Sequence, residues 1–360
     1  MDGEPHERLY EKRRMARDGH RNRKPRVKGE KIMNYIIFGG SGFIGTHLIH
    51  LLKETHPADN IYCLDIVMPG EEGVVPGIVE KNDGVIYERV DVRKKIEYEI
   101  ETTEDDVVFN LAAVHRTPGH EDHEYFETNI RGAENVTEWC ERKGIKKILF
   151  TSSIAPYGAA EEEKSEDTLP TPNTPYGISK LVAEKIHQGW ADKNNAQLVI
   201  VRPGIVYGKG EHGNMTRLYS GLKGHYFVYT GRKDTIKACI YVKELVRFFL
   251  WAIEEKKAGI WNCTFEPAFT IEQIVQAMES ATGLKTWVPL IPGKLLMGVA
   301  TVVGPIGGKA VGIHPARVKK LMISTNICGE KLKNSGYKWK YTLEGSFRDW
   351  FDDCNRECLK

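Results

Sequence analysis

A tyrosine and a lysine four residues apart, Tyr176 and Lys180, are the pair in this sequence with the clearest chemical use. Thr174 is a predicted helix N-cap, so both side chains should project from one face of the helix that follows. An unperturbed tyrosine ionises at about pH 10, and a neighbouring ammonium favours its phenolate form. Ser153 ends a strand-like run and offers a hydroxyl that can hydrogen-bond a reacting oxygen. Together the three side chains predict proton abstraction from an alcohol, with Tyr176 as the general base.

A glycine-rich segment, GGSGFIG at 39–45, has the spacing of a phosphate-binding loop. It follows a strand-like run and opens a helix-like one. Gly39 suits a tight turn, Gly42 lets the backbone approach a pyrophosphate, and Gly45 allows the helix to pack closely on the strand. The unpaired N–H groups at a helix N-terminus favour negative phosphates there. The segment therefore predicts a dinucleotide site.

An acidic residue, Asp65, ends the next strand-like run, about 20 positions after the glycine segment. A carboxylate there can accept hydrogen bonds from both ribose hydroxyls of adenosine, and it repels a 2′-phosphate. Ile66 and Val67 follow, so no arginine stands next to Asp65 to accommodate that phosphate. The predicted cofactor is NAD rather than NADP.

Short β-branched runs alternate with amphipathic segments from Tyr35 to about Arg202, and this alternation must position the residues above. Apolar strands separated by helices indicate a parallel sheet covered on both faces. The predicted fold is therefore α/β, a Rossmann-type doubly wound parallel sheet. The strand-like runs are 35–38, 61–65, 85–90, 107–113, 146–153 and 198–203, and the helix-like ones include 43–54, 123–142 and 176–193.

The alternation of strand-like and helix-like runs breaks off after Arg202, where glycine, proline and aromatic residues become more frequent. Residues 32–206 are predicted to form an NAD-binding Rossmann domain, which 238–264 rejoins. Residues 207–237 and 265–350 are predicted to form a smaller C-terminal substrate-binding lobe.

Two segments fall outside this pattern. Residues 1–31 carry eleven Lys and Arg against six Asp and Glu with almost no apolar side chains, which favours a disordered basic leader over a basic tether for an acidic surface. The stretch 288–313 is apolar, but lysines and prolines interrupt it and no uncharged run reaches about 18 residues. A lobe segment or lid is favoured there over an interfacial helix, and no transmembrane span is expected.

Composition limits the classes of partner. The chain has 360 residues and a formal net charge of only +2, so no concentrated basic face for nucleic acid is expected. Its seven cysteines have no framework spacing, which predicts reduced thiols in a cytoplasmic protein. Cys354 and Cys358 lack a second ligand pair nearby, so no metal site is expected.

Taken together, the motifs resemble those of the extended short-chain dehydrogenases/reductases, and within them the NAD-dependent epimerase/dehydratase family that acts on nucleotide sugars. The resemblance spans roughly residues 34–350 and rests on GGSGFIG, Asp65, Asp91-Val92, NLAA at 110–113, Asn129, TSSIAPYG and YGISK. It implies a catalytic group of Ser153, Tyr176 and Lys180, in which Lys180 holds the nicotinamide ribose. The cofactor contacts that it implies are Gly39, Gly42, Phe43, Ile44, Gly45, Asp65, Asp91, Val92, Ala112, Ala113, Asn129, Tyr176, Lys180 and Pro203.

The resemblance also implies roles outside the catalytic group. Asp91 and Val92 match the pair at the adenine edge. Ala112 and Ala113 match residues that line the cofactor channel, and Asn129 matches a helix position that contacts cofactor or active-site water. A homodimer through 123–142 and 176–193 is likewise implied by the family.

The substrate side departs from the family pattern. Ile205 stands where many nucleotide-sugar enzymes carry an Asn near the diphosphate, and Lys237 where an Arg often meets the phosphates. RPGIVYG at 202–208 also resembles 3β-hydroxysteroid dehydrogenases, whose substrates are apolar alcohols. Arg232, Lys233 and Lys237 nevertheless predict an anion site. The predicted substrate residues are His115, Arg116, Arg217, Arg232 and Lys237.

The reaction type is predicted from the two residues after Ser153. Family members that eliminate water carry an acidic pair there, whereas Ile154 and Ala155 cannot transfer a proton. We favour a nucleotide-sugar epimerase that oxidises its substrate to a keto-sugar and returns the hydride to the other face. The alternative is a 3β-hydroxysteroid dehydrogenase-like oxidoreductase that uses NAD on an apolar alcohol. A catalytically silent NAD-sensing protein is disfavoured by the intact Tyr/Lys/Ser group.

Overall fold

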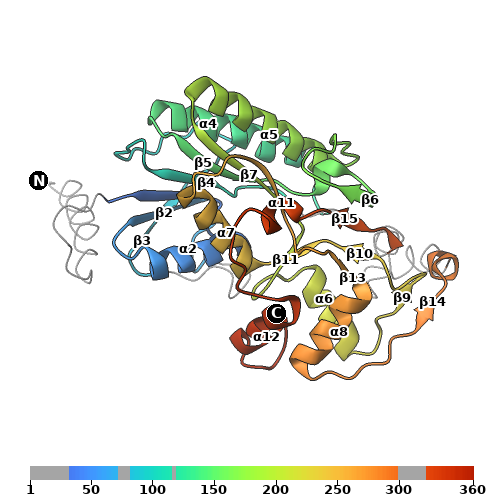
Figure 1. The fold of residues 1–360 in the computed structure, drawn as a ribbon. Coiled ribbons are helices and arrows are strands. Elements are labelled where there is room, and N and C mark those ends of the chain that lie inside the picture. The colour runs from blue at the N-terminus through green and yellow to red at the C-terminus, as the bar shows by residue number, and fades with distance from the viewer. Residues whose placement is uncertain (1–31, 72–81, 116–118, 299–321) are drawn as a thin grey trace, which may run out of the picture.

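A seven-stranded parallel sheet forms the centre of the protein (Figure 1). The computed structural model describes residues 32–71, 82–115, 119–298 and 322–360, so the predicted leader and Arg116 lie outside the described residues. The strand order β12-β7-β5-β4-β1-β2-β3 confirms the predicted doubly wound fold. The strands are β1 (Asn34–Phe38), β2 (Asn60–Asp65), β3 (Val85–Arg89), β4 (Val107–Asn110), β5 (Lys147–Thr151), β7 (Gln197–Pro203) and β12 (Gly259–Cys263).

The side chains of β1 point alternately into two apolar cores. Ile36 and Phe38 pack in one core, and Tyr35 and Ile37 pack in the other, because successive residues of a strand face opposite sides of the sheet. Burial on both faces explains why this strand reads as a continuous apolar run. In Figure 1 the first face is covered by α4 (Arg131–Arg142) and α5 (Pro175–Asn194), and the second by α2 (Phe43–Thr55) and α7 (Val242–Glu254).

The helix predicted over 123–142 is present, but one of its turns departs from α-helical geometry. The structure has α3 (Asp122–Tyr125), a π-helical turn η1 (Phe126–Ile130), and then α4. The Arg131 N–H donates to the Phe126 carbonyl five residues back, the hydrogen bond that defines a π-turn. Buried Asn129 lies within this turn.

The remaining strands form three smaller sheets, with orders β13-β10-β15-β6, β11-β8 and β14-β9. Three further helices, α6 (Asn214–Lys223), α8 (Ile271–Thr282) and α12 (Leu343–Asp353), pack around a third apolar core. The other elements are η2 (Ala155–Tyr157), β6 (Ala160–Lys164), β8 (Ile205–Tyr207), β9 (Tyr229–Thr230), β10 (Ile236–Lys237), β11 (Cys239–Tyr241), β13 (Phe269–Thr270), β14 (Leu290–Ile291), β15 (Thr325–Ile327) and α11 (Glu330–Lys333).

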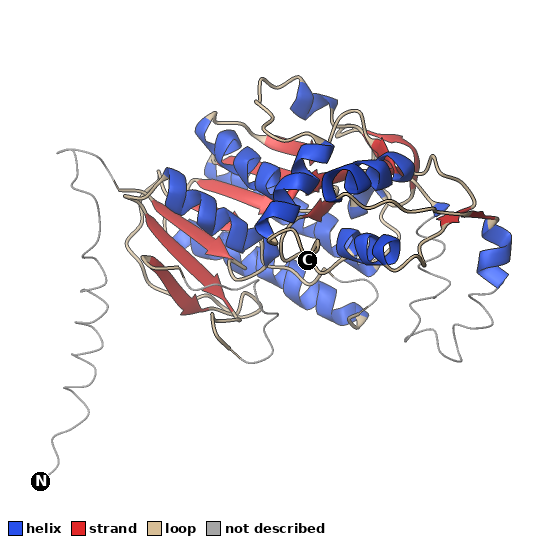
Figure 2. Ribbon diagram, turned by 90° about the horizontal axis from the view of Figure 1, so that it is seen from below, coloured by secondary structure: helices blue, strands red, loops and turns tan. Residues whose placement is uncertain are grey.

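The chain passes between the large sheet and the smaller ones several times (Figure 2). Strand β6 comes from within 32–206 but pairs with β15, whereas β12 returns to the edge of the large sheet beside β7. The predicted domain boundaries stay a prediction. Among the described helices, none has the length and apolar character needed to cross a membrane. Most of the apolar stretch 288–313 falls in the range 299–321, outside the described residues.

Candidate active site

The predicted catalytic and cofactor residues gather at the carboxyl edge of the large sheet. The strands are parallel, so all their carboxyl ends meet at this edge. The chain reverses its direction of winding between β1 and β4, the switch point at which open α/β sheets bind ligands. The glycine segment follows β1 at this edge. Asp65 ends β2 and Pro203 ends β7, while Ala112 follows β4 and Ser153 follows β5.

Gly39 and Gly45 stand where no side chain fits. Gly39 has a φ of 78°, and a Cβ there would lie 2.6 Å from the backbone N of Ala112. A Cβ on Gly45 would lie 2.6 Å from the backbone of the glycine loop, so Gly45 permits α2 to approach that loop. Gly42 is the N-cap of α2, whose first-turn N–H groups have no partners within the helix. This backbone cradle fits the pyrophosphate of a dinucleotide.

Asp65 ties the glycine loop to the end of β2. Its Oδ2 accepts from the Ser41 N–H at 3.0 Å and its Oδ1 from the Val67 N–H at 3.1 Å. The Ser41 hydroxyl donates to the Val67 carbonyl at 2.8 Å. Burial raises the pKa of the Asp65 carboxyl, and the backbone hydrogen bonds lower it. Ser41 was not predicted, although it is the serine of the glycine segment.

Tyr176 is held in the first turn of α5. Thr174 accepts a hydrogen bond from the Gly177 N–H at 3.1 Å, which confirms the predicted N-cap. A Cβ on Gly177 would lie 2.7 Å from the carbonyl oxygen of Ala155, so this glycine permits the helix to lie against the segment after Ser153. The Ser153 side chain lies near enough to the Tyr176 hydroxyl to lower the pKa of Tyr176. Gly177 had been assigned no role from the sequence.

Burial sets the charge states of the two ionisable catalytic candidates. Burial raises the pKa of Tyr176 to about 12, and the Ser153 side chain lowers it. Burial lowers the pKa of Lys180 to about 7, while the charge of Glu184 raises it. The Lys180 side chain is buried, and its Nζ donates to the Thr151 carbonyl at 2.8 Å. The phenol is therefore protonated at neutral pH, and its activation requires additional positive charge close to the ring.

Asn129 joins the end of β4 to helix α5. Its Oδ1 accepts from the Val114 N–H at 3.0 Å, and its Nδ2 donates to the Val114 carbonyl at 3.1 Å. The same Nδ2 donates to Ser179 Oγ at 2.9 Å, and Ser179 donates to the Tyr176 carbonyl at 2.9 Å. These bonds indicate a positioning role behind Tyr176. A contact between Asn129 and cofactor or water stays a prediction.

A buried ion pair that was not predicted lies one helical turn beyond Lys180. The Arg202 guanidinium donates to both carboxylate oxygens of Glu184, at 2.8 and 2.6 Å, and neither side chain is more than 1% exposed. Ser152 donates to Glu184 Oε1 at 2.5 Å, and the guanidinium carbon lies 4.6 Å from the Tyr157 ring centroid. Glu184 follows Lys180 by four residues, and that spacing was the available signal.

The remaining cofactor candidates lie beside this framework. Asp91 accepts from Arg93 Nε at 2.8 Å, a hydrogen bond that lowers the pKa of Asp91. Val92 is buried, and its carbonyl accepts from Asn135 of α4 at 2.7 Å. Partly buried positions are found for Phe43, Ile44, Ala112 and Ala113, and a buried one for Pro203.

Two of the predicted substrate residues, Arg232 and Lys237, meet around Glu161. Arg232 Nη2 lies 2.6 Å from Glu161 Oε2 and donates to Ser324 Oγ at 2.6 Å. Lys237 Nζ donates to the Ile323 carbonyl at 2.6 Å, and burial lowers the pKa of Lys237 to about 8. The guanidinium charge of Arg232 is thus partly neutralised within the protein.

The other cations engage different partners. Lys233 pairs with Glu272 at 3.1 Å, and Arg217, exposed on α6, donates to Asn214 Oδ1 at 3.1 Å. His115 is exposed after β4, at the end of a described segment, and Arg116 lies beyond it. The anion site inferred from these charges stays a prediction.

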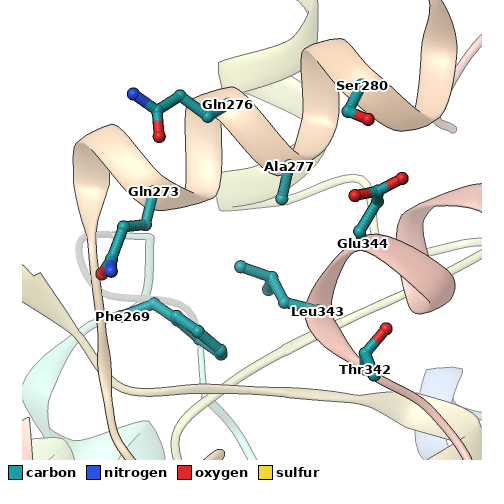
Figure 3. A pocket seen from close by; sticks show the side chains of 8 residues that line it. All are labelled: Phe269, Gln273, Gln276, Ala277, Ser280, Thr342, Leu343 and Glu344. Carbon is teal, nitrogen blue, oxygen red and sulfur yellow. The ribbon is translucent and has the colours of Figure 1, made fainter.

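An open groove of about 560 Å³ lies between α8 and the start of α12 (Figure 3). None of the predicted site residues lines it. Its lining residues are Phe269, Gln273, Gln276, Ala277, Ser280, Thr342, Leu343 and Glu344.

Known proteins share both the sequence pattern and the fold. The model of the NAD dependent epimerase/dehydratase family matches residues 35–264. The chain is 30% identical over 318 residues to the N-acetyl-alpha-D-glucosaminyl-diphospho-ditrans,octacis-undecaprenol 4-epimerase of Escherichia coli O157:H7. The aligned region covers 86% of this chain and 92% of the relative. It is 28% identical over 235 residues to a UDP-glucose 4-epimerase of Vibrio cholerae, which covers 62% of this chain and 67% of that relative.

Among solved structures, the fold is similar to that of UDP-glucuronic acid 4-epimerase from Bacillus cereus in complex with NAD. The TM-score is 0.69 at 21% identity, covering 91% of this chain and all of the other. At this identity the similarity establishes the fold alone.

Proposed function

The chain belongs to the NAD-dependent epimerase/dehydratase family, and from that membership we propose that it is an epimerase that inverts a hydroxyl-bearing carbon of a nucleotide sugar. The observation that carries the proposal is the placement of Ser153, just after β5, beside Tyr176 in the first turn of α5, in a family whose reaction begins at an alcohol. The residues after Ser153 support epimerisation over dehydration. Ile154 has no proton to transfer, and Ala155 contributes only its N–H, which donates to Ser153 Oγ at 3.1 Å.

Proton transfer at the sugar hydroxyl is the step assigned to the chain. Tyr176 Oη accepts the hydroxyl proton as that carbon is oxidised to a ketone, and returns a proton to the same oxygen after the sugar has turned over. Ser153 Oγ hydrogen-bonds the reacting oxygen, and Lys180 in its ammonium form would favour the phenolate of Tyr176. Bound NAD supplies the hydride acceptor for the first half and the hydride donor for the second. The glycine segment would hold its pyrophosphate, and Asp65 its adenosine ribose.

The carrier of the sugar is the second part of the proposal. Arg232 and Lys237 support a diphosphate at the substrate. Their cationic side chains hydrogen-bond the adjacent residues Ser324 and Ile323, so the two positive groups lie close together. A polyprenol is a second candidate carrier besides a nucleotide. The Escherichia coli relative, which is similar over nearly its whole length, is named for a polyprenyl-diphosphate-linked sugar. Both carriers present the same chemistry, a sugar diphosphate.

The proposed function is tested by incubating the protein with NAD and UDP-glucose, UDP-N-acetylglucosamine, or undecaprenyl-diphospho-N-acetylglucosamine. We expect an epimer of one of these sugars to form without accumulation of NADH. Product stereochemistry is read by NMR, and NADH by its absorbance. A 4-keto-6-deoxy product, or NADH in proportion to an oxidised steroid alcohol, contradicts the proposal.

Cofactor choice is expected to depend on Asp65. The double substitution Asp65→Ser/Ile66→Arg should lower the ratio of NAD to NADP affinity by roughly 10–100-fold, because it removes a charged hydrogen-bond acceptor and adds a partner for the 2′-phosphate. Ile66 is 48% exposed, so an arginine fits there without repacking. Calorimetric titration with each cofactor measures the ratio, and Ile66→Arg alone is the matched control. Equal affinity of the native protein for both cofactors rules out this role.

The assembly state and location complete the proposal. Ile178 and Val182 are 40% and 37% exposed on α5, and these apolar groups support a homodimer through α4 and α5. All seven cysteines are unpaired thiols, which supports a reducing, cytoplasmic location.

A further inference from the structure

Four large apolar side chains are strongly exposed on two segments that lie side by side, residues 226–231 and 285–295. Trp287 is 82% exposed, Tyr226 68%, Leu295 61% and Leu290 50%. Scattered exposed apolar residues are ordinary, but a cluster of this kind marks a site of interaction. We name these four residues, with the exposed lysines of the same segments, Lys285 and Lys294, the lobe tip.

The pairing of β9 with β14 brings the two segments together. Tyr229 lies opposite Leu290 in this parallel pair, the Tyr229 N–H donates to the Pro289 carbonyl at 2.9 Å, and the Gly231 N–H donates to the Ile291 carbonyl at 2.8 Å. Tyr226 and Trp287 each precede their member of the Tyr229–Leu290 pair by three residues, so both lie before the same end of this small sheet. In Figures 1 and 2, β9 and β14 lie at the end of the molecule opposite β3.

The exposed side chains project from an anchored frame. Tyr229 is buried in the third apolar core, and Phe227 and Val288 pack against that core. The Thr286 N–H donates to the Glu279 carboxylate of α8 at 2.9 Å, which fixes the chain just before Trp287. Exposure of the lobe tip therefore belongs to the folded arrangement of these segments, with the apolar rings and chains turned outward.

The charged side chains of the two segments that form the lobe tip are all positive, and the Glu279 carboxylate that borders them accepts a hydrogen bond from the Thr286 N–H. Residues 223–231 and 284–298 contain Lys223, Lys285 and Lys294 and no Asp or Glu. Tryptophan and tyrosine favour the headgroup level of a bilayer, and lysine keeps its ammonium among the headgroups while its methylene chain lies along apolar surface. A surface with this composition complements anionic lipid.

We propose that the lobe tip docks on an anionic phospholipid surface, with Trp287, Leu290 and Leu295 inserted at the headgroup boundary. The inference rests on the proposed function in its polyprenol-linked form, because such a substrate is held in a bilayer that the enzyme must reach. A second copy of the chain is the competing occupant. A symmetric contact would bring Lys285 and Lys294 of both copies into one interface whose own segments offer no carboxylate to pair with them, and this repulsion favours lipid.

Flotation of the full chain with vesicles tests the proposal. Vesicles of phosphatidylcholine alone are compared with vesicles of phosphatidylcholine and phosphatidylglycerol. We expect the native protein to float with the anionic vesicles, and the Trp287→Ser/Leu295→Ser variant to stay behind. Leu169→Ser is the matched control, since Leu169 is 80% exposed on the loop between β6 and α5 and should leave flotation at the native level.

A second variant tests the charge contribution without altering apolar surface. Lys285→Gln/Lys294→Gln should weaken binding to anionic vesicles by roughly tenfold or more, and added salt should weaken native binding in the same direction. Absence of native flotation overturns the proposal, as does equal flotation of all variants. Self-association of the native protein that the Trp287→Ser/Leu295→Ser variant loses, measured by sedimentation velocity, would assign the surface to a second copy instead.

The test is separable from that of the proposed function. Flotation requires no substrate, so docking without epimerase activity overturns the proposed function and leaves the docking surface in place. Conversely, turnover of a water-soluble nucleotide sugar without vesicles should be the same in the lobe-tip variants and the native protein. Epimerase activity with no flotation would overturn the docking surface alone.

Discussion

Turnover of the Tyr176→Phe protein is expected to fall by about 10²–10⁴-fold, while its affinity for NAD stays close to that of the native protein. The substitution removes only the phenolic oxygen, the atom that exchanges the substrate proton, and leaves the ring packed 6.1 Å from that of Tyr125. Steady-state epimerase kinetics measure the loss, and calorimetric titration measures the affinity.

Tyr125→Phe is the matched control for this loss. It removes a hydroxyl from the buried tyrosine whose ring neighbours that of Tyr176. We expect Tyr125→Phe to lower turnover far less than Tyr176→Phe does. Near-native turnover of Tyr176→Phe would exclude Tyr176 as the base, and equal losses in both variants would point to ring packing instead of proton transfer.

Glu184→Gln is expected to lower the free energy of unfolding by about 3–5 kcal/mol, because it leaves the guanidinium of Arg202 buried without a counter-charge. The pair lies inside the protein, bound through two hydrogen bonds at 2.8 and 2.6 Å, so water cannot replace the missing charge. Urea denaturation followed by circular dichroism measures the change. Glu134→Gln is the control, since the ion pair of Glu134 with Arg131 is exposed and should contribute less than about 1 kcal/mol.

Removal of both charges separates the cost of an unpaired ion from the value of the pair. Glu184→Leu/Arg202→Met replaces both groups with apolar ones, and its stability should lie well above that of Glu184→Gln. A Glu184→Gln protein as stable as the native one would show that Arg202 reaches water or another partner. In that case the pair would not fix α5 against β7.

The large sheet was predictable because its central strands, β1, β4, β5 and β7, are buried on both faces. Each expected strand exists, since continuous apolar runs between helices have few alternatives. The boundary of β4 was less predictable. The run 107–113 looks strand-like throughout, but β4 ends at Asn110, and the chain turns to let Ala112 approach Gly39. That close approach depends on a loop more than 70 residues away and leaves no local signal.

The catalytic group was predictable, whereas its supports were not. Tyr176 and Lys180 can be recognised in the sequence because they are spaced four residues apart within one helix. Gly177 and Arg202 act through contacts with other elements, so no local pattern revealed them.

The cationic cluster shows the opposite limitation. Arg232 and Lys233 look like unpaired charges in the sequence, yet Glu161 and Glu272 pair with them from distant segments. Proximity in sequence therefore predicted where the charges lie but not whether they are available to a substrate.

The π-turn before α4 has a consequence for the history of this sequence. A π-turn is one residue longer than the α-helical turn it replaces, so it amounts to an insertion that the helix has absorbed. Deleting one residue from Phe126–Ile130 would rotate everything before it by about 100° relative to α4. Asn129 could then no longer face Val114 while Val136 and Trp139 face the sheet. In descendants of this gene, the amino-acid types of this segment can therefore change more readily than its length.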